Sequence, residues 1–123
     1  MGIFSGLIGN VSEMSIDEVI QEFGQLLGEN EAIDAGYKLI RDCMIFTNKR
    51  IILIDKQGIT AKKIEYMSIP YKSIERFSVE TAGHFDLDAE LKLWVRGMAE
   101  PIEQQFNSKV SIYEVQSIIA KYI

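Results

Sequence analysis

The chain has 123 residues, of which 47% are hydrophobic and 25% charged, and its formal net charge is −5. These values are typical of one globular domain with its own core. The negative charge argues against a nucleic-acid interface and against attraction to anionic lipid, although a local basic patch remains compatible with it. No apolar run is long enough to span a bilayer, and the apolar start of the chain lacks the pattern of a signal peptide.

The chain contains one cysteine and one histidine. Cys43 stands among apolar residues, so we interpret it as a small buried side chain and not as a catalytic thiol. A single cysteine cannot form an internal disulfide, which fits a cytoplasmic protein. His84 alone cannot form a two-histidine metal site, and no nucleophile elbow or phosphate-binding glycine loop is present. The sequence therefore predicts no enzyme activity, no metal and no cofactor.

The first predicted element is a helix from about Ser15 to Leu27. Ser15 and Glu18 have the spacing of a capping box, apolar residues follow at helical intervals, and Gly28 is placed to end the helix. With the residues before it, this helix makes up an amino-terminal region over 1–28. The start of that region is an apolar lead-in that contains Ile3, Phe4, Leu7 and Ile8.

A pattern of short strands covers residues 31–107. Its centre is a hairpin from Cys43 to Asp55, in which two apolar runs flank a Thr47-Asn48-Lys49-Arg50 corner. The run Ile51–Ile54 is apolar at every position, which predicts a strand buried on both faces. The other expected strands are Ile33–Leu39, Lys62–Ile69 with a bulge between Tyr66 and Met67, Ser73–Thr81, Ala89–Arg96, and an edge strand with Ile102, Gln104 and Phe106.

The last predicted element is an amphipathic helix over 110–123. Ser111 and Glu114 form a second capping box, and Lys121 lies in the last turn, where the helix dipole favours a cation. The apolar stripe consists of Ile112, Val115, Ile118, Ile119 and Tyr122. Closely spaced strands favour antiparallel pairing. We therefore expect a mainly β fold of about seven antiparallel strands in two sheets, whose open corner is capped by this helix.

Three stretches carry a family resemblance: FTNKRIILIDKQGI, SIPYKSIERFSVETAGHFDLDAELKLWV and the closing SIYEVQSIIAKYI. They resemble the bacterial pleckstrin-homology (PH) domain family over nearly the whole chain. The resemblance implies one PH-like domain over 1–123, without enzyme activity, whose single-domain relatives form cyclic rings, here with five copies. It supplies no ligand. Eukaryotic PH domains usually carry a tryptophan in the last helix, whereas the sole tryptophan here, Trp94, falls in a strand.

The stretch around Trp94 alternates strictly between apolar and polar residues. Phe85, Leu87, Ala89, Leu91, Leu93 and Val95 fall on one face, and the other face carries His84, Asp86, Asp88, Glu90, Lys92, Trp94 and Arg96. The acidic part is either a solvated face or a weak cation site. Trp94 either lies across its neighbours' side chains, or is covered by the amino-terminal helix, or contacts another chain.

We expect the chain to form a closed homo-oligomeric ring that serves as a scaffold for an unknown protein partner. Trp94 on a charged face, an apolar lead-in with no place in a closed sandwich, and sheet edges that must be paired all favour self-association. The candidate protein-binding surface comprises Lys49, Arg50, Glu80, His84, Asp86, Asp88, Lys92, Trp94 and Arg96.

The alternative is a peripheral membrane adaptor or anionic-ligand adaptor. Lys49 and Arg50 at the hairpin corner form either an anion site or a solvated turn. Eukaryotic PH domains that bind phosphoinositides use basic residues in the loop between their first two strands. The corresponding loop here, Arg41-Asp42, is short and carries one charge of each sign, so we expect no specific lipid binding.

Overall fold

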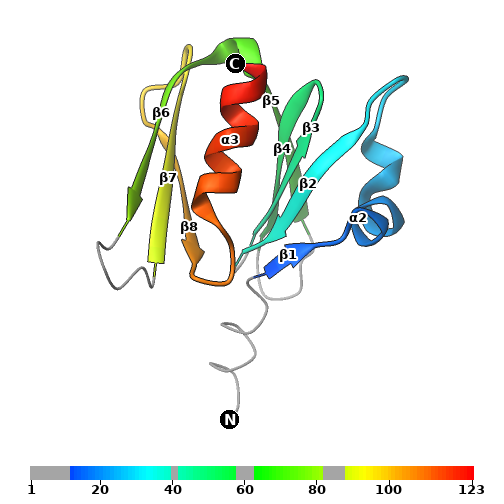
Figure 1. Cartoon of the computed structure of the whole chain (residues 1–123). Coiled ribbons are helices and arrows are strands. Elements are labelled where there is room, and N and C mark those ends of the chain that lie inside the picture. The colour runs from blue at the N-terminus through cyan, green and yellow to red at the C-terminus, as the bar shows by residue number, and fades with distance from the viewer. Residues whose placement is uncertain (1–11, 40–41, 58–62, 82–87) are drawn as a thin grey trace.

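The computed structural model describes residues 12–39, 42–57, 63–81 and 88–123 (Figure 1). In chain order the elements are β1 (Ser12–Met14), α2 (Ile16–Phe23), η1 (Gly24–Leu26), β2 (Ile33–Lys38), β3 (Asp42–Thr47), β4 (Arg50–Gln57), β5 (Lys63–Pro70), η2 (Tyr71–Ser73), β6 (Ile74–Thr81), β7 (Asp88–Val95), β8 (Ile102–Asn107) and α3 (Ile112–Tyr122).

The strands form two sheets in which every neighbouring pair is antiparallel. One sheet has the order β1-β2-β3-β4-β5 and the other has the order β6-β7-β8. Figure 1 shows α3 between the two sheets, on the side of β8 and β2, and α2 beside the five-stranded sheet. The predicted mainly β architecture with a carboxy-terminal helix is therefore confirmed.

The inner core lies between the two sheets and α3. Tyr37 of β2 is fully buried there, with the rings of Phe46 and Phe106 packed edge-on against it at centroid distances of 5.9 Å each. The carboxyl end of α3 is held by Tyr122, whose ring stacks on Tyr71 at 4.9 Å and whose hydroxyl donates to Asp34 Oδ2 at 2.6 Å. The helix is thus fastened across the opening between the sheets.

A second apolar cluster lies under α2, on the outer face of the five-stranded sheet. It contains Met14, Val19, Phe23, Cys43, Ile45, Ile52 and Ile54. Ile51 and Leu53 point instead into the inner core, so the strand Ile51–Ile54 is buried on both faces, as its sequence predicts. Cys43 is buried too, and burial raises the pKa of its thiol, which fits the predicted structural role.

Three details of the strands differ from the prediction. β1 was not expected, because three residues, two of them polar, carry no readable period. No bulge interrupts β5, whose register with β4 runs unbroken from Arg50↔Pro70 to Gln57↔Lys63. The apolar pattern of this segment suggested a bulge because β5 is an edge strand. It carries exposed apolar side chains on its outer face as well as apolar side chains that face the core. Register shifts occur instead at Ile33/Ala35 and at Ile74/Arg76.

The two capping boxes have different outcomes. At α2 the Ser15 amide donates to Glu18 Oε1 at 2.9 Å and the Glu18 amide donates to Ser15 Oγ at 3.1 Å, which completes the box. The helix is shorter than predicted, because a 3-10 turn over Gly24–Leu26 follows Phe23. At α3 only the Ser111 hydroxyl takes part, accepting from the Glu114 amide at 3.3 Å. The Glu114 carboxylate accepts from the Tyr37 hydroxyl instead, at 3.4 Å.

Gly36 of β2 lets α2 approach the sheet closely. A Cβ atom at this position would lie 2.5 Å from Val19 Cγ2, and the branched valine has little freedom to turn away. We expect Gly36→Ala to lower the free energy of unfolding by about 2 kcal/mol, measured by urea denaturation. Gly24→Ala is the matched control, since its Cβ would meet Ile20 Cγ2 at an ordinary 3.5 Å. Equal effects of the two changes would contradict this account of the contact.

Candidate functional site

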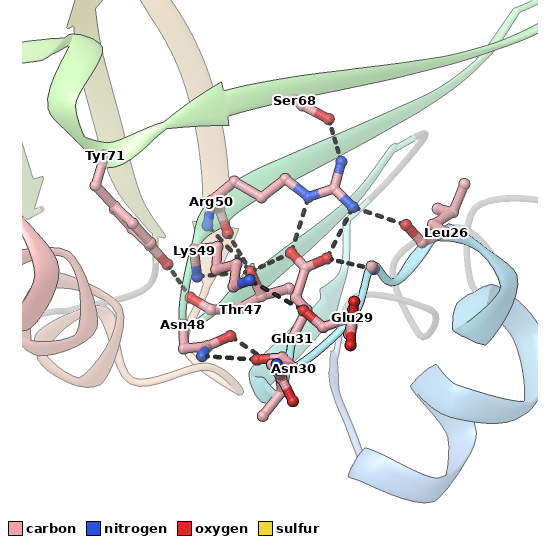
Figure 2. Close-up of polar contacts among 12 residues, drawn as sticks. Leu26, Glu29, Asn30, Glu31, Thr47, Asn48, Lys49, Arg50, Ser68 and Tyr71 are labelled. Carbon is pink, nitrogen blue, oxygen red and sulfur yellow. Dashed lines mark hydrogen bonds and ion pairs between the residues drawn. The ribbon is translucent and has the colours of Figure 1, made fainter.

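The hairpin corner between β3 and β4 is closed by a threonine (Figure 2). Thr47 Oγ1 accepts from the amides of Lys49 and Arg50, both at 3.0 Å, and donates to Glu31 Oε2 at 2.7 Å. Thr47 is fully buried, and its carbonyl accepts from the Tyr71 hydroxyl at 2.7 Å. The corner is therefore a rigid, internally bonded turn.

Arg50 and Glu31 form a bidentate ion pair at this corner. Arg50 Nε lies 2.8 Å from Glu31 Oε2, and Arg50 Nη2 lies 2.9 Å from Glu31 Oε1. The guanidinium also donates to the Leu26 carbonyl and to Ser68 Oγ, both at 2.7 Å. The Glu31 side chain is only 2% exposed, and the hydrogen bonds from Arg50 are the main cause that lowers the pKa of its carboxyl to about 2.

The neighbouring corner residues bind the same segment of backbone. Asn48 Oδ1 accepts from the Ala32 amide at 2.8 Å, and Asn48 Nδ2 donates to the Asn30 carbonyl at 3.3 Å. Lys49 Nζ donates to the Glu29 carbonyl at 3.0 Å. The corner therefore fastens the segment after α2 to the central hairpin. The Arg50 guanidinium donates four hydrogen bonds within the chain, which favours a structural role for this residue over a solvated turn residue or an open anion site.

The outer face of the three-stranded sheet carries the predicted alternation. Ala89, Leu91 and Leu93 are buried, whereas Asp88, Glu90, Lys92 and Trp94 lie on the opposite face, exposed or half-buried. The partners across β6 and β7 are Arg76↔Trp94, Ser78↔Lys92 and Glu80↔Glu90. Of the predicted surface, His84 and Asp86 lie outside the described residues, as do Phe85 and Leu87 on the apolar face.

Trp94 is half-buried beside Arg76, whose guanidinium carbon lies 4.4 Å from the centroid of the indole ring. The amino-terminal helix does not cover it, since α2 packs on β2 of the other sheet. That interpretation of Trp94 was therefore wrong, and the one in which it lies across its neighbours' side chains agrees with the structure. Arg96 lies at the same end of the face, with Nη2 donating to the Lys72 carbonyl at 3.4 Å.

The charges on this face are segregated along the strands. Arg76 and Arg96 lie at the Trp94 end, and Glu80, Asp88 and Glu90 lie toward the other end. The acidic residues line a shallow hollow of about 360 Å³ with Thr81, Ala89 and Gln105. Lys92 lies between the two ends, with Nζ 3.9 Å from Glu90 Oε1. Within the described ranges, no group of three or more metal-ligating side chains is placed to hold an ion.

Two residues of these sites were missed by the sequence analysis. Glu31 stands 19 positions before Arg50, in a loop, so no periodic pattern connects the two. Arg76 was not paired with Trp94, because the register shift between Ile74 and Arg76 hides which β6 residue faces the indole. The sequence did contain a pattern that places Arg76 on the outer face, because polar and apolar residues alternate from Arg76 to Glu80.

Comparisons with known proteins place the chain among bacterial relatives. The family model described as "Bacterial PH domain" matches residues 2–123. The uncharacterized protein YjqA of Bacillus subtilis (strain 168) is 54% identical over 121 residues, which cover 98% of this chain and 97% of YjqA. The uncharacterized protein YozO of the same strain is 37% identical over 123 residues, which cover 100% of this chain and 98% of YozO.

Solved structures agree with this assignment. A DUF1696 family protein with a PH domain from Shewanella loihica PV-4 has a TM-score of 0.83 and 49% identity, covering 92% of this chain and 97% of its own. A PH domain from Shewanella amazonensis SB2B has a TM-score of 0.74 and 48% identity, covering 98% of each chain. None of these descriptions names an enzyme. No helix in the described part of this chain is long and apolar enough to cross a membrane.

Proposed function

Since this chain belongs to the bacterial PH domain family, we propose that it is a non-enzymatic PH-like domain that assembles into a closed ring of identical copies and serves as a scaffold for a protein partner. The ring contains five copies. A head-to-tail contact between unlike surfaces closes into a ring when the rotation between neighbours permits it.

The observation that carries this proposal is the Trp94–Arg76 pair on an outer sheet face. Trp94 is half-buried within one copy, and the guanidinium of Arg76 lies over its ring at 4.4 Å. Tryptophan and arginine are among the residues enriched at interface hot spots, where a partner removes the remaining water from the contact. We assign the contact between neighbouring copies to this end of the face.

The acidic end of the same face is the surface for the partner. Glu80, Asp88 and Glu90 surround the hollow there. The alternation of the sequence predicts the same face for His84 and Asp86, which lie outside the described residues. Their charge favours a partner with a basic segment. A ring repeats this rim once per copy, so that several weak contacts act together and raise the overall affinity without strengthening any single one.

The ring is tested by light scattering across a dilution series. We expect a parent mass of several copies that stays constant on dilution, and a lower mass for Trp94→Ala and for Arg76→Glu. Tyr113→Ala on α3 is the matched control, because this tyrosine is 64% exposed and lies away from the proposed contact. A parent that is monomeric at every concentration would refute the ring, and an intact ring in Trp94→Ala would remove Trp94 from its interface.

The membrane or anionic-ligand adaptor ranks second. Its basic corner offers only Lys49, since Arg50 is bound to Glu31, and Lys49 already donates to the Glu29 carbonyl. We expect no cosedimentation with phosphatidylserine vesicles at about 0.15 M salt, where exposed charges are screened beyond roughly 8 Å. Binding that disappears in Lys49→Glu would favour this adaptor. A hydrolase turnover that disappears in His84→Ala would contradict the non-enzymatic assignment.

A further inference from the structure

α2 carries two adjacent apolar side chains that remain exposed. Its buried residues are Val19 and Phe23, which belong to the cluster on the outer face of the five-stranded sheet. Ile16 and Ile20 lie one helical turn apart on the same side of the helix, and they are 48% and 50% exposed. Isolated exposed apolar residues are ordinary, whereas adjacent ones favour a contact surface. We call this pair, Ile16 and Ile20, the α2 ridge.

The charges on α2 are all negative. The helix contains three acidic residues and no lysine or arginine: Asp17, Glu18 and Glu22. Glu18 is held in the capping box, and Glu22 lies 3.6 Å from Lys56 Nζ. Asp17 is exposed, stands next to the ridge, and forms no ion pair with another residue in the described ranges. α2 therefore presents an apolar ridge beside a carboxylate that lacks a cation.

The Trp94 end of the β6–β7 face has the complementary character. Arg76 lies over the indole ring of Trp94 at 4.4 Å, and the exposed Arg96 lies at the same end. Neither guanidinium forms an ion pair with any other residue that the structure describes. Glu75, exposed at the register shift beside Arg76, brings one carboxylate, which the two guanidinium groups outnumber. This end thus combines a half-buried aromatic ring with positive charge.

The two surfaces lie on opposite sides of one copy. α2 packs on the outer face of the five-stranded sheet, whereas Trp94 lies on the outer face of the three-stranded sheet, with the inner core between them. Figure 1 accordingly shows α2, in blue, and the strands β6 and β7, in green to yellow, at opposite sides of the molecule. One copy can therefore offer α2 to one neighbour and Trp94 to another, as a head-to-tail ring requires.

We propose that the α2 ridge of one copy receives the Trp94 end of the next copy. This inference rests on the proposed function, because it names the second surface of the ring contact. The indole of Trp94 packs on the ridge, which removes apolar area of both copies from water. Asp17 lies near the guanidinium groups of Arg76 and Arg96 of the next copy, and this pairing of charges sets the orientation of the two copies.

The other exposed apolar pair matches the Trp94 end less well. Ile64 and Tyr66 of β5 are 40% and 47% exposed, on the outer face of the same sheet. Ile64 stands directly opposite Lys56 of β4, so the nearest charge on that face across the strand pair has the same sign as the guanidinium groups. The α2 ridge has Asp17 beside it instead, which favours it as the receiving surface.

Two substitutions of opposite charge at Ile20 test the contact by light scattering. Ile20→Arg sets a cation against the guanidinium groups, so we expect single copies at concentrations where the parent forms its ring. Ile20→Glu removes the same apolar side chain but keeps the complementary charge, so its ring should dissociate only on further dilution. Tyr113→Arg, at a 64% exposed position of α3, is the matched control and should keep the parental mass. Thermal midpoints close to that of the parent verify that the variants are folded.

Chemical cross-linking tests the direction of the contact. Gln21 is exposed on α2 next to the ridge, and Ser78 follows Arg76 by two residues on the β6–β7 face. A head-to-tail contact brings Gln21 of one copy near Ser78 of the next. We expect a short bismaleimide reagent to give a ladder of cross-linked copies in the double variant Q21C/S78C and no ladder in either single variant, since the native Cys43 is buried.

The outcomes separate this inference from the ring itself. A parental ring that is lost in Trp94→Ala but unchanged in Ile20→Arg keeps the proposed function and overturns the role of α2. A monomeric parent overturns both. A lower thermal midpoint of Ile20→Arg with the parental mass would assign the ridge to a segment of its own chain, such as the apolar lead-in, and would also overturn the proposal. Cross-linked pairs in either single-cysteine variant would contradict the head-to-tail direction.

Discussion

Replacing Glu31 with glutamine is expected to lower the free energy of unfolding by about 3 kcal/mol at neutral pH. The carboxylate is 2% exposed and accepts hydrogen bonds from Arg50, Thr47 and the Gly28 amide (Figure 2). The amide of glutamine keeps the shape but removes the charge, and it leaves the guanidinium partly buried without its counter-ion. Because the Arg50 side chain is 26% exposed, we expect a loss at the lower end of the range that is typical when one partner of a buried ion pair is removed.

Urea denaturation of the parent, Glu31→Gln and Glu29→Gln measures this effect. Glu29 is an exposed neighbour of the same type, and only its backbone carbonyl contacts the corner, so its replacement should change stability by less than about 0.5 kcal/mol. Combining Glu31→Gln with Arg50→Met removes both charges and should cost no more than Glu31→Gln alone. A loss in Glu31→Gln no larger than in the control would show that the ion pair adds nothing to the fold.

The pH dependence of stability gives a second measurement of the same ion pair. The pKa of Glu31 is lowered from 4.5 to about 2 in the folded chain, so its contribution is fully present above pH 4.5 and is lost as the pH falls toward 2. The size of the shift corresponds to about 3 kcal/mol. The free energy of unfolding of the parent should therefore fall toward that of Glu31→Gln between pH 4.5 and 2. A difference in stability that stays constant across that range would contradict a stabilising role for the ionised Glu31 carboxylate.

The features that the sequence predicts correctly are those determined by the pattern of apolar and polar residues within a single helix or hairpin. The central hairpin consists of two apolar runs on either side of a turn that Asn48 favours, and α3 has a capped start and a regular apolar stripe, so each element can be located from its own residues. The alternation from Asp88 to Trp94 likewise identifies the outward side chains of β7. Burial of the apolar half of such a pattern requires no knowledge of distant residues.

The features that the sequence does not reveal depend on pairing across the chain. Glu31 and Arg50 meet because the segment after α2 returns to the hairpin, and nothing in either local pattern indicates this. The position of Arg76 over Trp94 depends on one register shift in β6. The expected bulge in β5 was wrong for a related reason, because an edge strand can carry apolar residues on both faces when only one of them meets the core.

Phe106→Ala is expected to cause a loss of about 4 kcal/mol, because a fully buried aromatic ring leaves both a transfer cost and a cavity. Phe106 is the member of the aromatic cluster that comes from the three-stranded sheet, whereas Tyr37 and Phe46 come from the five-stranded sheet. Its ring lies edge-on to Tyr37 at an interplanar angle of 86°. Removing it should therefore loosen the contact between the sheets.

The matched control for Phe106→Ala is Phe77→Ala, which deletes the same side chain from a half-buried position on β6. We expect the control to cost about 2 kcal/mol, in proportion to the smaller apolar area that it exposes. Guanidinium denaturation measures both losses, and the near-ultraviolet circular dichroism of the folded state should change more in Phe106→Ala, since Tyr37 loses one of its two packed rings. Equal losses in the two variants would mean that the sheets are held together mainly by α3 and not by the aromatic cluster between them.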